Sequence, residues 1–168
     1  MKVAILTVSD RSATGIRPDV SGPAIEEFMR KHGGEIISTA IVPDDLLEIK
    51  SVLESWCDHL GVDIILTTGG TGFAPRDITP EATRQVIQRE APGIAEAMRL
   101  ESLKITPHAM LSRAIAGIRN KTIIINLPGS PKAALENLNT IIRVLPHAVE
   151  LLKENPNAEA GHSFPQSP

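Results

Sequence analysis

The residues best suited to chemistry lie in residues 63–83, where a short apolar run leads into a glycine-rich loop. Residues 64–66 predict a buried strand, and the loop that follows it contains Gly69, Gly70 and Gly72. Because glycine has no Cβ, consecutive amides there can turn inward and form a concave row of N–H donors suited to phosphate oxygens. The pattern therefore predicts a phosphate-binding loop, and a tight strand-to-helix turn that binds no ligand is the alternative.

The helix expected after this loop brings a second feature that favours anions. Thr79 is suited to be its N-cap and Pro80 its first residue, where the missing N–H costs nothing. The N-terminus of that helix adds donors and a partial positive charge beside the loop. Arg76 and Asp77 lie between the loop and the helix, and with Thr79 as the cap Asp77 is not needed for capping. The loop is neither a Walker A motif nor a G-x-G-x-x-G dinucleotide fingerprint.

A second carboxylate comes from the end of another predicted strand. Residues 35–42 predict that strand, and Asp44 and Asp45 follow it. Asp45 and Glu48 resemble a capping box, which leaves Asp44 without that role. Asp44 is then either a partner of the helix dipole or an oxygen ligand that shares a hard cation such as Mg²⁺ with Asp77.

Polar residues also follow the other predicted strands. Ser9 and Asp10 end a β-prone run, residues 2–9, and Asn126 ends the apolar run at residues 122–126. In open α/β sheets, ligands bind at the carboxyl ends of the strands, although Asp10 fits a solvated turn equally well. The clusters together predict a site for a phosphate-rich ligand and a divalent ion, and hence phosphoryl or nucleotidyl transfer by positioning and charge stabilisation.

The elements that must position these clusters follow from the hydrophobic periodicity. Strands are expected at residues 2–9, 35–42, 64–66, 113–118 and 121–126, and helices at 23–32, 46–60, 80–89, 93–103 and from 131 to about 152. Pro146 is expected to bend the last helix. The order predicts an α/β fold, a three-layer α/β/α domain with a mostly parallel, mixed sheet. We expect residues 1–153 to form this single domain and residues 154–168, which are rich in Asn, Pro, Gly and Ser, to be a loose tail.

The composition is that of an ordinary soluble protein and excludes several classes. The chain has 168 residues, 42% of them hydrophobic, and a formal net charge of −3. It has no basic run, and with three Phe, one Trp and no Tyr it offers few rings for stacking on a polynucleotide, so no nucleic-acid partner is expected. No apolar run approaches a membrane span, residues 1–9 do not resemble a signal sequence, and the single cysteine, Cys57, fits a buried packing residue. We therefore expect a cytoplasmic protein with no membrane partner.

Four motifs, in the same order along the chain, resemble those of the molybdopterin adenylyltransferases, the MogA and MoaB-like family related to the G domain of gephyrin. They are TTGGTG at residues 67–72, PRDITPEA at 75–82, LSR at 111–113 and NLPG at 126–129. The likeness extends from Val3 to about Leu152, nearly the whole chain. It implies a mixed sheet of about five strands, a homotrimer, molybdopterin and ATP as ligands, and a molybdenum insertase as a further partner. The implied reaction requires Mg²⁺: the molybdopterin phosphate attacks the α-phosphate of ATP, and pyrophosphate leaves.

The matching motif positions imply roles for individual residues. Asp44 and Asp77 match the family's acidic pair, so the resemblance implies that both are catalytic and hold the metal. The positions implied to bind nucleotide and phosphate are Ser9, Asp10, Gly69, Gly70, Thr71, Gly72, Asn126 and Gly129. Those implied to bind the second substrate are Ser21, Gly22, Thr79, Ser112 and Arg113, and Ser21 and Gly22 belong to the family's D-x-S-G segment at residues 19–22. Arg76 and Arg113 are suited either to clamp phosphate or to form structural ion pairs.

Two other functions fit the same residues. A family member that binds molybdopterin without turnover would be a carrier or an assembly scaffold. A domain of the competence-damage type shares the fold and a Gly-Gly-x-Gly loop and acts on nucleotide pyrophosphates. In that type we expect Gly-Leu-Gly-Pro followed by paired aspartates, whereas this chain has Gly-Thr-Gly-Phe at residues 70–73 and the single Asp77.

Overall fold

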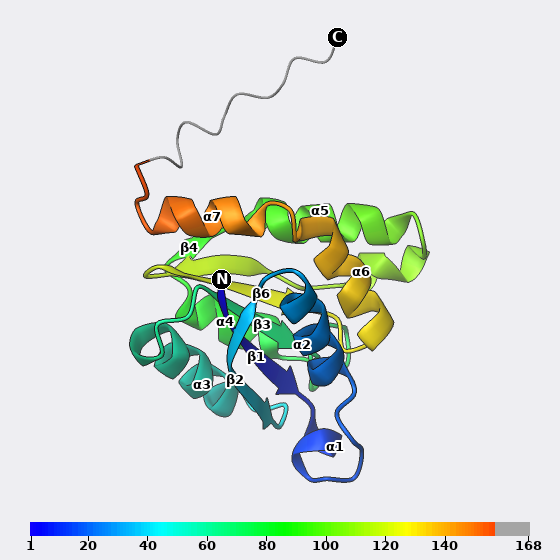
Figure 1. Cartoon of the computed structure of the whole chain (residues 1–168). Helices are drawn as coiled ribbons and strands as arrows, with labels where there is room; N and C mark the ends of the chain where they lie inside the picture. The colour runs from blue at the N-terminus through cyan, green and yellow to red at the C-terminus, as the bar shows by residue number, and fades with distance from the viewer. Residues whose placement is uncertain (157–168) are drawn as a thin grey trace.

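The computed structural model describes residues 1–156, which form an α/β fold around one six-stranded sheet (Figure 1). The strands are β1 (Lys2–Val8), β2 (Glu35–Val42), β3 (Ile64–Thr68), β4 (Arg89–Glu90), β5 (Ala116–Arg119) and β6 (Thr122–Leu127), and their order across the sheet is β2-β1-β3-β6-β5-β4. The first four strands in that order are parallel, and β5 and β4 add an antiparallel edge. The mostly parallel, mixed sheet is confirmed, with one strand more than the sequence suggested.

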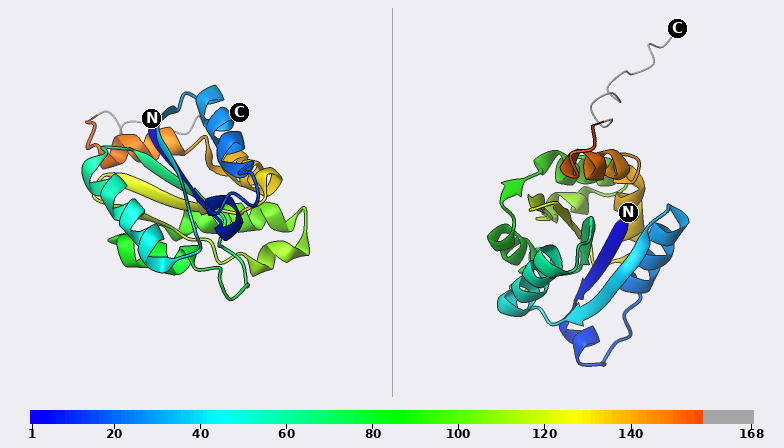
Figure 2. Two further views of the ribbon diagram at one scale, coloured as in Figure 1. Left: turned by 90° about the horizontal axis from the view of Figure 1, so that it is seen from below. Right: turned by 60° about the vertical axis from the view of Figure 1, so that its left-hand side comes forward.

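Helices cover both faces of the sheet. They are α1 (Asp10–Ala13), α2 (Ser21–Lys31), α3 (Leu46–His59), α4 (Thr79–Val86), α5 (Pro92–Leu103), α6 (Pro131–Ile141), α7 (Leu145–Leu152) and the 3₁₀ helix η1 (Pro107–Leu111). Helices α2, α5, α6 and α7 pack on one face and α3 and α4 on the other, as two further views show (Figure 2). The three-layer arrangement is therefore confirmed.

The strand sequences explain why both faces are covered. Alternate side chains of a strand point to opposite faces, so Val3 and Ile5 join one apolar cluster while Ala4 and Leu6 join the other. All five residues of β3 and all six of β6 are buried, which matches their continuous apolar runs. Cys57 is buried in α3 as expected.

Several boundaries differ from the sequence-based expectation, and three of the differences are the largest. The helix expected to reach residue 89 ends at Val86, and β4 follows it because Arg89 pairs with Ile118 of β5. The strand expected from residue 113 begins at Ala116. The expected long final helix is two helices: α6 ends at Ile141, and Pro146 lies in the first turn of α7, where a missing N–H is tolerated. Of the expected tail, residues 157–168 lie outside the described part of the chain.

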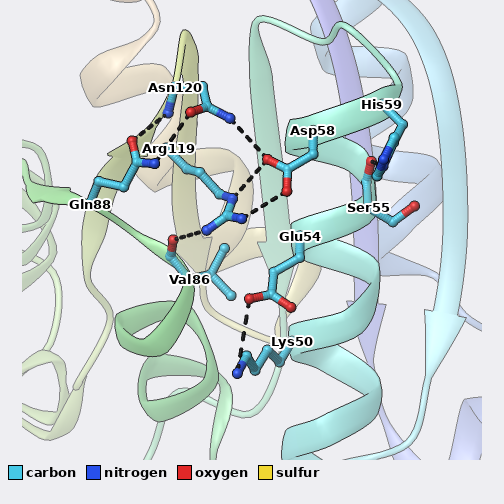
Figure 3. A network of polar contacts seen from close by, with 9 residues as sticks. All are labelled: Lys50, Glu54, Ser55, Asp58, His59, Val86, Gln88, Arg119 and Asn120. Atoms are coloured by element: carbon cyan, nitrogen blue, oxygen red, sulfur yellow. Dashed lines mark hydrogen bonds and ion pairs between the residues drawn. The ribbon is translucent and has the colours of Figure 1, made fainter.

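The end of the sheet where the parallel strands begin is held by a polar network (Figure 3). Asp58 near the end of α3 accepts two hydrogen bonds from Arg119, at 2.9 and 2.7 Å, and one from the side chain of Asn120 at 2.9 Å. Asn120 has φ of 53°, a left-handed conformation that lets it form the turn between β5 and β6. The network fixes this hairpin to α3, far from the opposite strand ends where the predicted site lies. None of the helices in residues 1–156 has both the length and the apolar character needed to cross a membrane.

Candidate functional site

A polar cavity of about 510 Å³ lies at the carboxyl ends of the parallel strands. The arrows of β1 and β2 end beside α1, which forms part of its wall (Figure 1). Eight of the residues expected to act at the site line this cavity: Ser9, Asp10, Ser21, Asp44, Gly69, Gly70, Asp77 and Gly129. The topology explains this, because parallel strands bring the segments that follow them to one edge of the sheet.

The glycine loop after β3 has a backbone that other residues would strain. Gly69 and Gly70 have φ of 101° and 62°. A Cβ on Gly69 would collide with the carbonyl of Val8, and one on Gly70 would collide with the Thr79 hydroxyl and lie 3.1 Å from an Asp44 oxygen. Among the described residues, none accepts a hydrogen bond from the N–H groups of Gly70, Thr71 or Gly72. The loop thus offers consecutive amides that residues 1–156 do not use.

Thr79 closes the loop and does not cap α4 with its side chain, contrary to the sequence-based expectation. It is the first residue of the helix, and Ile78 is the N-cap. The Thr79 hydroxyl donates to Gly69 O at 2.9 Å, and its N–H donates to Gly70 O at 3.0 Å. With no exposed surface, Thr79 uses its polar groups to hold Gly69 and Gly70 in place.

Asp77 takes no part in capping, as expected, but its carboxylate has a structural contact. One oxygen accepts the N–H of Ala74 at 2.9 Å and would lie 2.8 Å from a Cβ on Gly72. The side chain is half-buried and borders the polar cavity. Asp77 therefore both fixes the turn at residues 74–77 and faces the cavity.

Asp10 and Asp44 line the polar cavity, and Arg76 contacts both of them without lining it. Arg76 donates a hydrogen bond to Asp10 Oδ1 at 2.9 Å and forms an ion pair with Asp10 Oδ2 at 2.5 Å. This hydrogen bonding by Arg76 lowers the pKa of Asp10. Burial raises the pKa of Asp44, and the negative charges of Asp10 and Asp77 add to that increase. The lining of the polar cavity thus holds four aspartates, Asp10, Asp19, Asp44 and Asp77, together with Arg11 and Arg17.

A second cavity, smaller and mainly apolar, borders the other part of the loop, and we call it the enclosed cavity. It has a volume of about 260 Å³ and lies among α5, η1 and α6. Thr71, Gly72 and Ser112, all expected site residues, line it. Sequence reasoning missed its polar pair, in which the Ser102 hydroxyl donates to Asn137 Oδ1 at 2.7 Å. A signal for Asn137 was present, because this amide lies on the inward face of its helix, which is otherwise apolar.

Two expected contact residues are engaged within the protein. Asn126 has no exposed surface, and its amide donates to Thr67 and Thr83 at 3.0 and 2.9 Å, so it joins β6 to β3 and α4 and borders neither cavity. Arg113 donates to Gly72 O at 2.7 Å and also to Asp77 O, and it forms an ion pair with Glu81. Arg113 thereby holds the loop in place without lining the polar cavity.

The D-x-S-G segment positions the loop after β6. Asp19, which sequence reasoning cited only as part of that motif, accepts the N–H groups of Ser21 and Gly22 at 2.9 and 3.1 Å and the Thr7 hydroxyl at 2.7 Å. The Ser21 hydroxyl then donates to Gly129 O at 2.8 Å. Gly22 itself borders a different cavity, beside β2. The segment therefore supports one wall of the polar cavity and contributes Ser21 to its surface.

A third cavity, which we call the side groove, adjoins the polar cavity at Asp77. It has a volume of about 510 Å³ and is lined by Leu46, Phe73, Ala74, Pro75, Asp77, Ile78, Glu81 and Arg113. Phe73 is 66% exposed there.

The chain is similar to known proteins along almost all of its length. A family model described as "Probable molybdopterin binding domain" matches residues 4–147. The molybdopterin adenylyltransferase of Helicobacter pylori (strain ATCC 700392 / 26695) is 45% identical over 91% of this chain and 88% of that protein. Gephyrin of Dictyostelium discoideum is 44% identical over 98% of this chain, which spans only 24% of that protein. The solved structure of MoaB from Thermus thermophilus matches with a TM-score of 0.87 and 52% identity, over 92% of this chain and 98% of that one.

Proposed function

Because this chain belongs to the family of probable molybdopterin-binding domains that includes MogA and MoaB, we propose that it is a molybdopterin adenylyltransferase of molybdenum cofactor biosynthesis. In this reaction an oxygen of the terminal phosphate of molybdopterin attacks the α-phosphorus of ATP. A P–O bond forms to that phosphorus and its bond to the bridging β-phosphate oxygen breaks. The products are adenylyl-molybdopterin and pyrophosphate.

The observation that best supports this function is that one glycine loop borders both the polar and the enclosed cavity. Gly69 and Gly70 line the polar cavity, and Thr71 and Gly72 line the enclosed one. A substrate with a flat ring at one end and a phosphate at the other can therefore extend along the loop from one cavity into the other. We assign the reacting phosphates to the polar cavity and the pterin to the enclosed one.

The loop and its supports would stabilise the reacting phosphates. The free N–H groups of Gly70, Thr71 and Gly72 suit the non-bridging oxygens, on which negative charge develops during transfer. Arg113 contacts the loop backbone and does not line the polar cavity, so we assign it a positioning role. Arg76 is 65% exposed, and its ion pair with Asp10 is of the exposed kind that contributes little to stability, so it is suited to turn toward phosphate. The mechanism requires no covalent intermediate with the protein.

The carboxylates of the polar cavity fit a hard divalent cation such as Mg²⁺. Repulsion from Asp77 contributes to the raised pKa of Asp44, and a cation between the two would relieve it. Within residues 1–156 no group of three His, Cys, Asp or Glu side chains is arranged as a metal site. Mg²⁺ is commonly held by one or two carboxylates together with substrate phosphates, so Asp44 and Asp77 suffice on the protein side. A bound Mg²⁺ would withdraw negative charge from the α-phosphate.

The enclosed cavity offers several polar groups that suit a pterin ring. Thr71 and Ser112 lie at the loop side, and Ser102 and Asn137 lie at the helix side. A pterin presents hydrogen-bond donors and acceptors around a flat apolar face, which matches a mainly apolar cavity with a few placed polar groups. We therefore propose Ser102, Ser112 and Asn137 as residues that orient the pterin.

The direct test is to incubate the purified protein with molybdopterin, ATP and Mg²⁺ and to separate the products by chromatography. We expect adenylyl-molybdopterin and pyrophosphate in equal amounts. Binding of molybdopterin without release of pyrophosphate would favour the carrier function instead. Cleavage of the nucleotide at the same rate with and without molybdopterin would favour a nucleotide pyrophosphatase.

A further inference from the structure

We propose that Glu81 is a positioning residue for the adenylyl transfer, which acts through Arg113 to keep the N–H groups of the glycine loop directed toward phosphate. The inference rests on the proposed function, because it concerns how the loop used in that reaction is held in shape. The family resemblance assigns Glu81 no role.

Four consecutive carbonyl groups of the loop, those of residues 69–72, accept hydrogen bonds from two residues. Thr79 donates to the first carbonyl with its hydroxyl, at 2.9 Å, and to the second with its N–H, at 3.0 Å. Arg113 donates to the third with its N–H, at 2.9 Å, and to the fourth with its guanidinium Nε, at 2.7 Å. The backbone of the loop is therefore fixed through its acceptors.

Fixing a carbonyl group also sets the direction of the N–H group that follows it. The peptide units of the loop are trans, so the C=O of one residue and the N–H of the next point in opposite directions. The N–H of each residue from 70 to 73 therefore points away from the residue that bonds the preceding carbonyl. Within residues 1–156 none of these four N–H groups donates a hydrogen bond. The bonds on the carbonyls thus leave a row of donors directed toward a ligand.

The guanidinium of Arg113 also holds the segment that carries Asp77. Besides Gly72 O, it donates to the backbone carbonyl of Asp77, so it joins the two ends of residues 72–77. One side chain therefore fixes both the last part of the donor row and the backbone of a carboxylate proposed to hold the metal.

Glu81, in the first turn of α4, determines where that guanidinium lies. One oxygen of its carboxylate forms an ion pair with Arg113 Nη1, while Nε and Nη2 of the same planar group donate to the loop. The side chains of Arg113 and Glu81 are 33% and 43% exposed, so water screens their attraction less than that of a fully exposed pair. Without Glu81, the guanidinium would be able to turn from the loop carbonyls toward solvent.

The second carboxylate oxygen of Glu81 argues against a role in stability alone. This oxygen, Oε2, is shielded from solvent and has no hydrogen-bond partner among the described residues. An acceptor that is shielded and unpaired lowers stability. A carboxylate in the first turn favours the helix through its dipole, but that interaction depends on charge and requires no contact with Arg113. The contact of Glu81 with Arg113 thus serves the loop at a cost in stability.

Two substitutions of similar length separate positioning from the helix dipole. Glu81→Gln and Glu81→Met both remove the charge, but glutamine keeps an oxygen that accepts hydrogen bonds from Arg113. We measure turnover with molybdopterin, ATP and Mg²⁺, well below the melting temperature of every variant. Glu81→Met should lower turnover by about tenfold to a hundredfold, the range expected for a slight misplacement of the loop, and Glu81→Gln should restore most of it. Equal turnover in the two variants would overturn the positioning role, and Glu81→Ala replaces Glu81→Met if the latter does not fold.

Glu90→Met is the matched control, because Glu90 also pairs with an arginine, Arg84, and lines none of the three cavities. It should leave turnover unchanged. Arg113→Lys keeps the charge and loses the planar fork, so it should lower turnover as Glu81→Met does. Because Glu81 acts through Arg113, the two substitutions together should cost little more than either alone. A loss equal to the product of the single effects would show that Glu81 acts independently of Arg113 and would overturn the inference.

Binding of inorganic tripolyphosphate, titrated with Mg²⁺ present by isothermal calorimetry, reports the loop donors without the reaction. Glu81→Met should bind it several-fold more weakly than the wild type and Glu90→Met. Normal turnover together with normal binding in Glu81→Met would overturn the role of Glu81 and leave the proposed function in place. A wild type that binds tripolyphosphate but does not adenylylate molybdopterin would overturn the proposed function, and the binding to Glu81→Met would then decide the role of Glu81. If the wild type neither binds nor reacts, both fail.

Discussion

Asp10 and Asp44 each accept the other's backbone N–H with their carboxylates, across 34 residues of sequence. The Asp10 N–H donates to Asp44 Oδ2 at 2.9 Å, and the Asp44 N–H donates to Asp10 Oδ1 at 3.0 Å. This exchange connects the segments that follow β1 and β2, so two carboxylates from neighbouring strand ends are held at one cavity. The two hydrogen bonds hold each carboxylate in one orientation and limit the rotation of both side chains.

The first test is Asp44→Asn. An asparagine retains an oxygen that can accept the Asp10 N–H but loses the charge proposed to hold the metal. We expect turnover to fall by orders of magnitude while the melting temperature stays at or slightly above that of the wild type, because an uncharged side chain avoids repulsion from Asp10 and Asp77. Mg²⁺ should raise the melting temperature of the wild type and not that of the variant. Unchanged turnover would exclude Asp44 from the chemistry.

Asp77→Asn tests the second carboxylate. The amide oxygen of asparagine can still accept the Ala74 N–H, so the turn should persist and stability should stay within about 1 kcal/mol of the wild type. Turnover should nevertheless fall by orders of magnitude. Asp77→Ala is the informative companion, because it removes the turn contact as well and should lower stability further. A folded Asp77→Asn protein with normal turnover would contradict the proposed role.

The sequence predicted the arrangement of strand ends better than the contacts made there. Asp44, Asp77 and the glycines could be placed together because parallel strands bring the segments after them to one edge of the sheet. The role of Thr79 could not be derived from the sequence. A threonine ahead of a proline is a good N-cap, yet its hydroxyl instead bonds to Gly69 O, a contact that depends on how the loop folds back.

Asn126 is a second residue whose contacts could not be predicted from the sequence. Its position at the end of an apolar strand indicated a residue exposed to ligand, but the strand continues to Leu127 and the amide pairs with Thr67 and Thr83. Those partners lie on β3 and α4, so only the packing of three elements determines where the amide points. The enclosed cavity was missed for a related reason, since helices distant in sequence build it.

Gly70→Ala and Gly15→Ala form a matched pair that tests the shape of the loop. Both glycines have left-handed backbones, with φ of 62° and 73°, so each substitution costs about 1 to 2 kcal/mol of backbone strain. A Cβ at Gly15 meets open space, whereas one at Gly70 collides with Thr79. Gly70→Ala should therefore be clearly less stable than Gly15→Ala in urea unfolding. Equal losses would show that the loop relaxes easily and that Gly70 is not sterically constrained.

The network at the other end of the sheet should make stability depend on pH through Asp58. Hydrogen bonding to Arg119 lowers the pKa of Asp58 below its ordinary value of 3.8. Because the folded-state pKa is the lower one, the stabilisation is present above about pH 3.8 and is lost as the pH falls through the folded-state pKa.

The variant Asp58→Asn isolates this contribution. Its melting temperature should be lower than that of the wild type at neutral pH, and the difference should shrink as the pH falls below the ordinary pKa of the carboxyl. Glu27→Gln, which removes an exposed pair with Lys31 inside α2, should show a smaller difference at neutral pH. If the difference in melting temperature between the wild type and Asp58→Asn stays the same at every pH, including pH values well below the ordinary pKa of the carboxyl, Asp58 stabilises the fold without its charge.

The last test concerns assembly, for which we expect a cyclic homotrimer with each site built mainly within one chain. Large apolar side chains are exposed from the end of α5 through η1, namely Leu100, Leu103, Ile105, Met110 and Leu111. Such a concentration marks a surface that a protein partner usually covers, and a neighbouring copy is the occupant expected for this family. The residues of the polar cavity come from the strand ends of one sheet, so assembly should stabilise the fold without completing the chemistry.

Light scattering at micromolar concentration should give the mass of three chains. Met110 lines none of the three cavities, so Met110→Glu should lower that mass without altering the site. Leu47 is exposed elsewhere on the surface, and Leu47→Glu should leave the mass unchanged. A wild-type protein that has the mass of one chain and is fully active would refute the trimer.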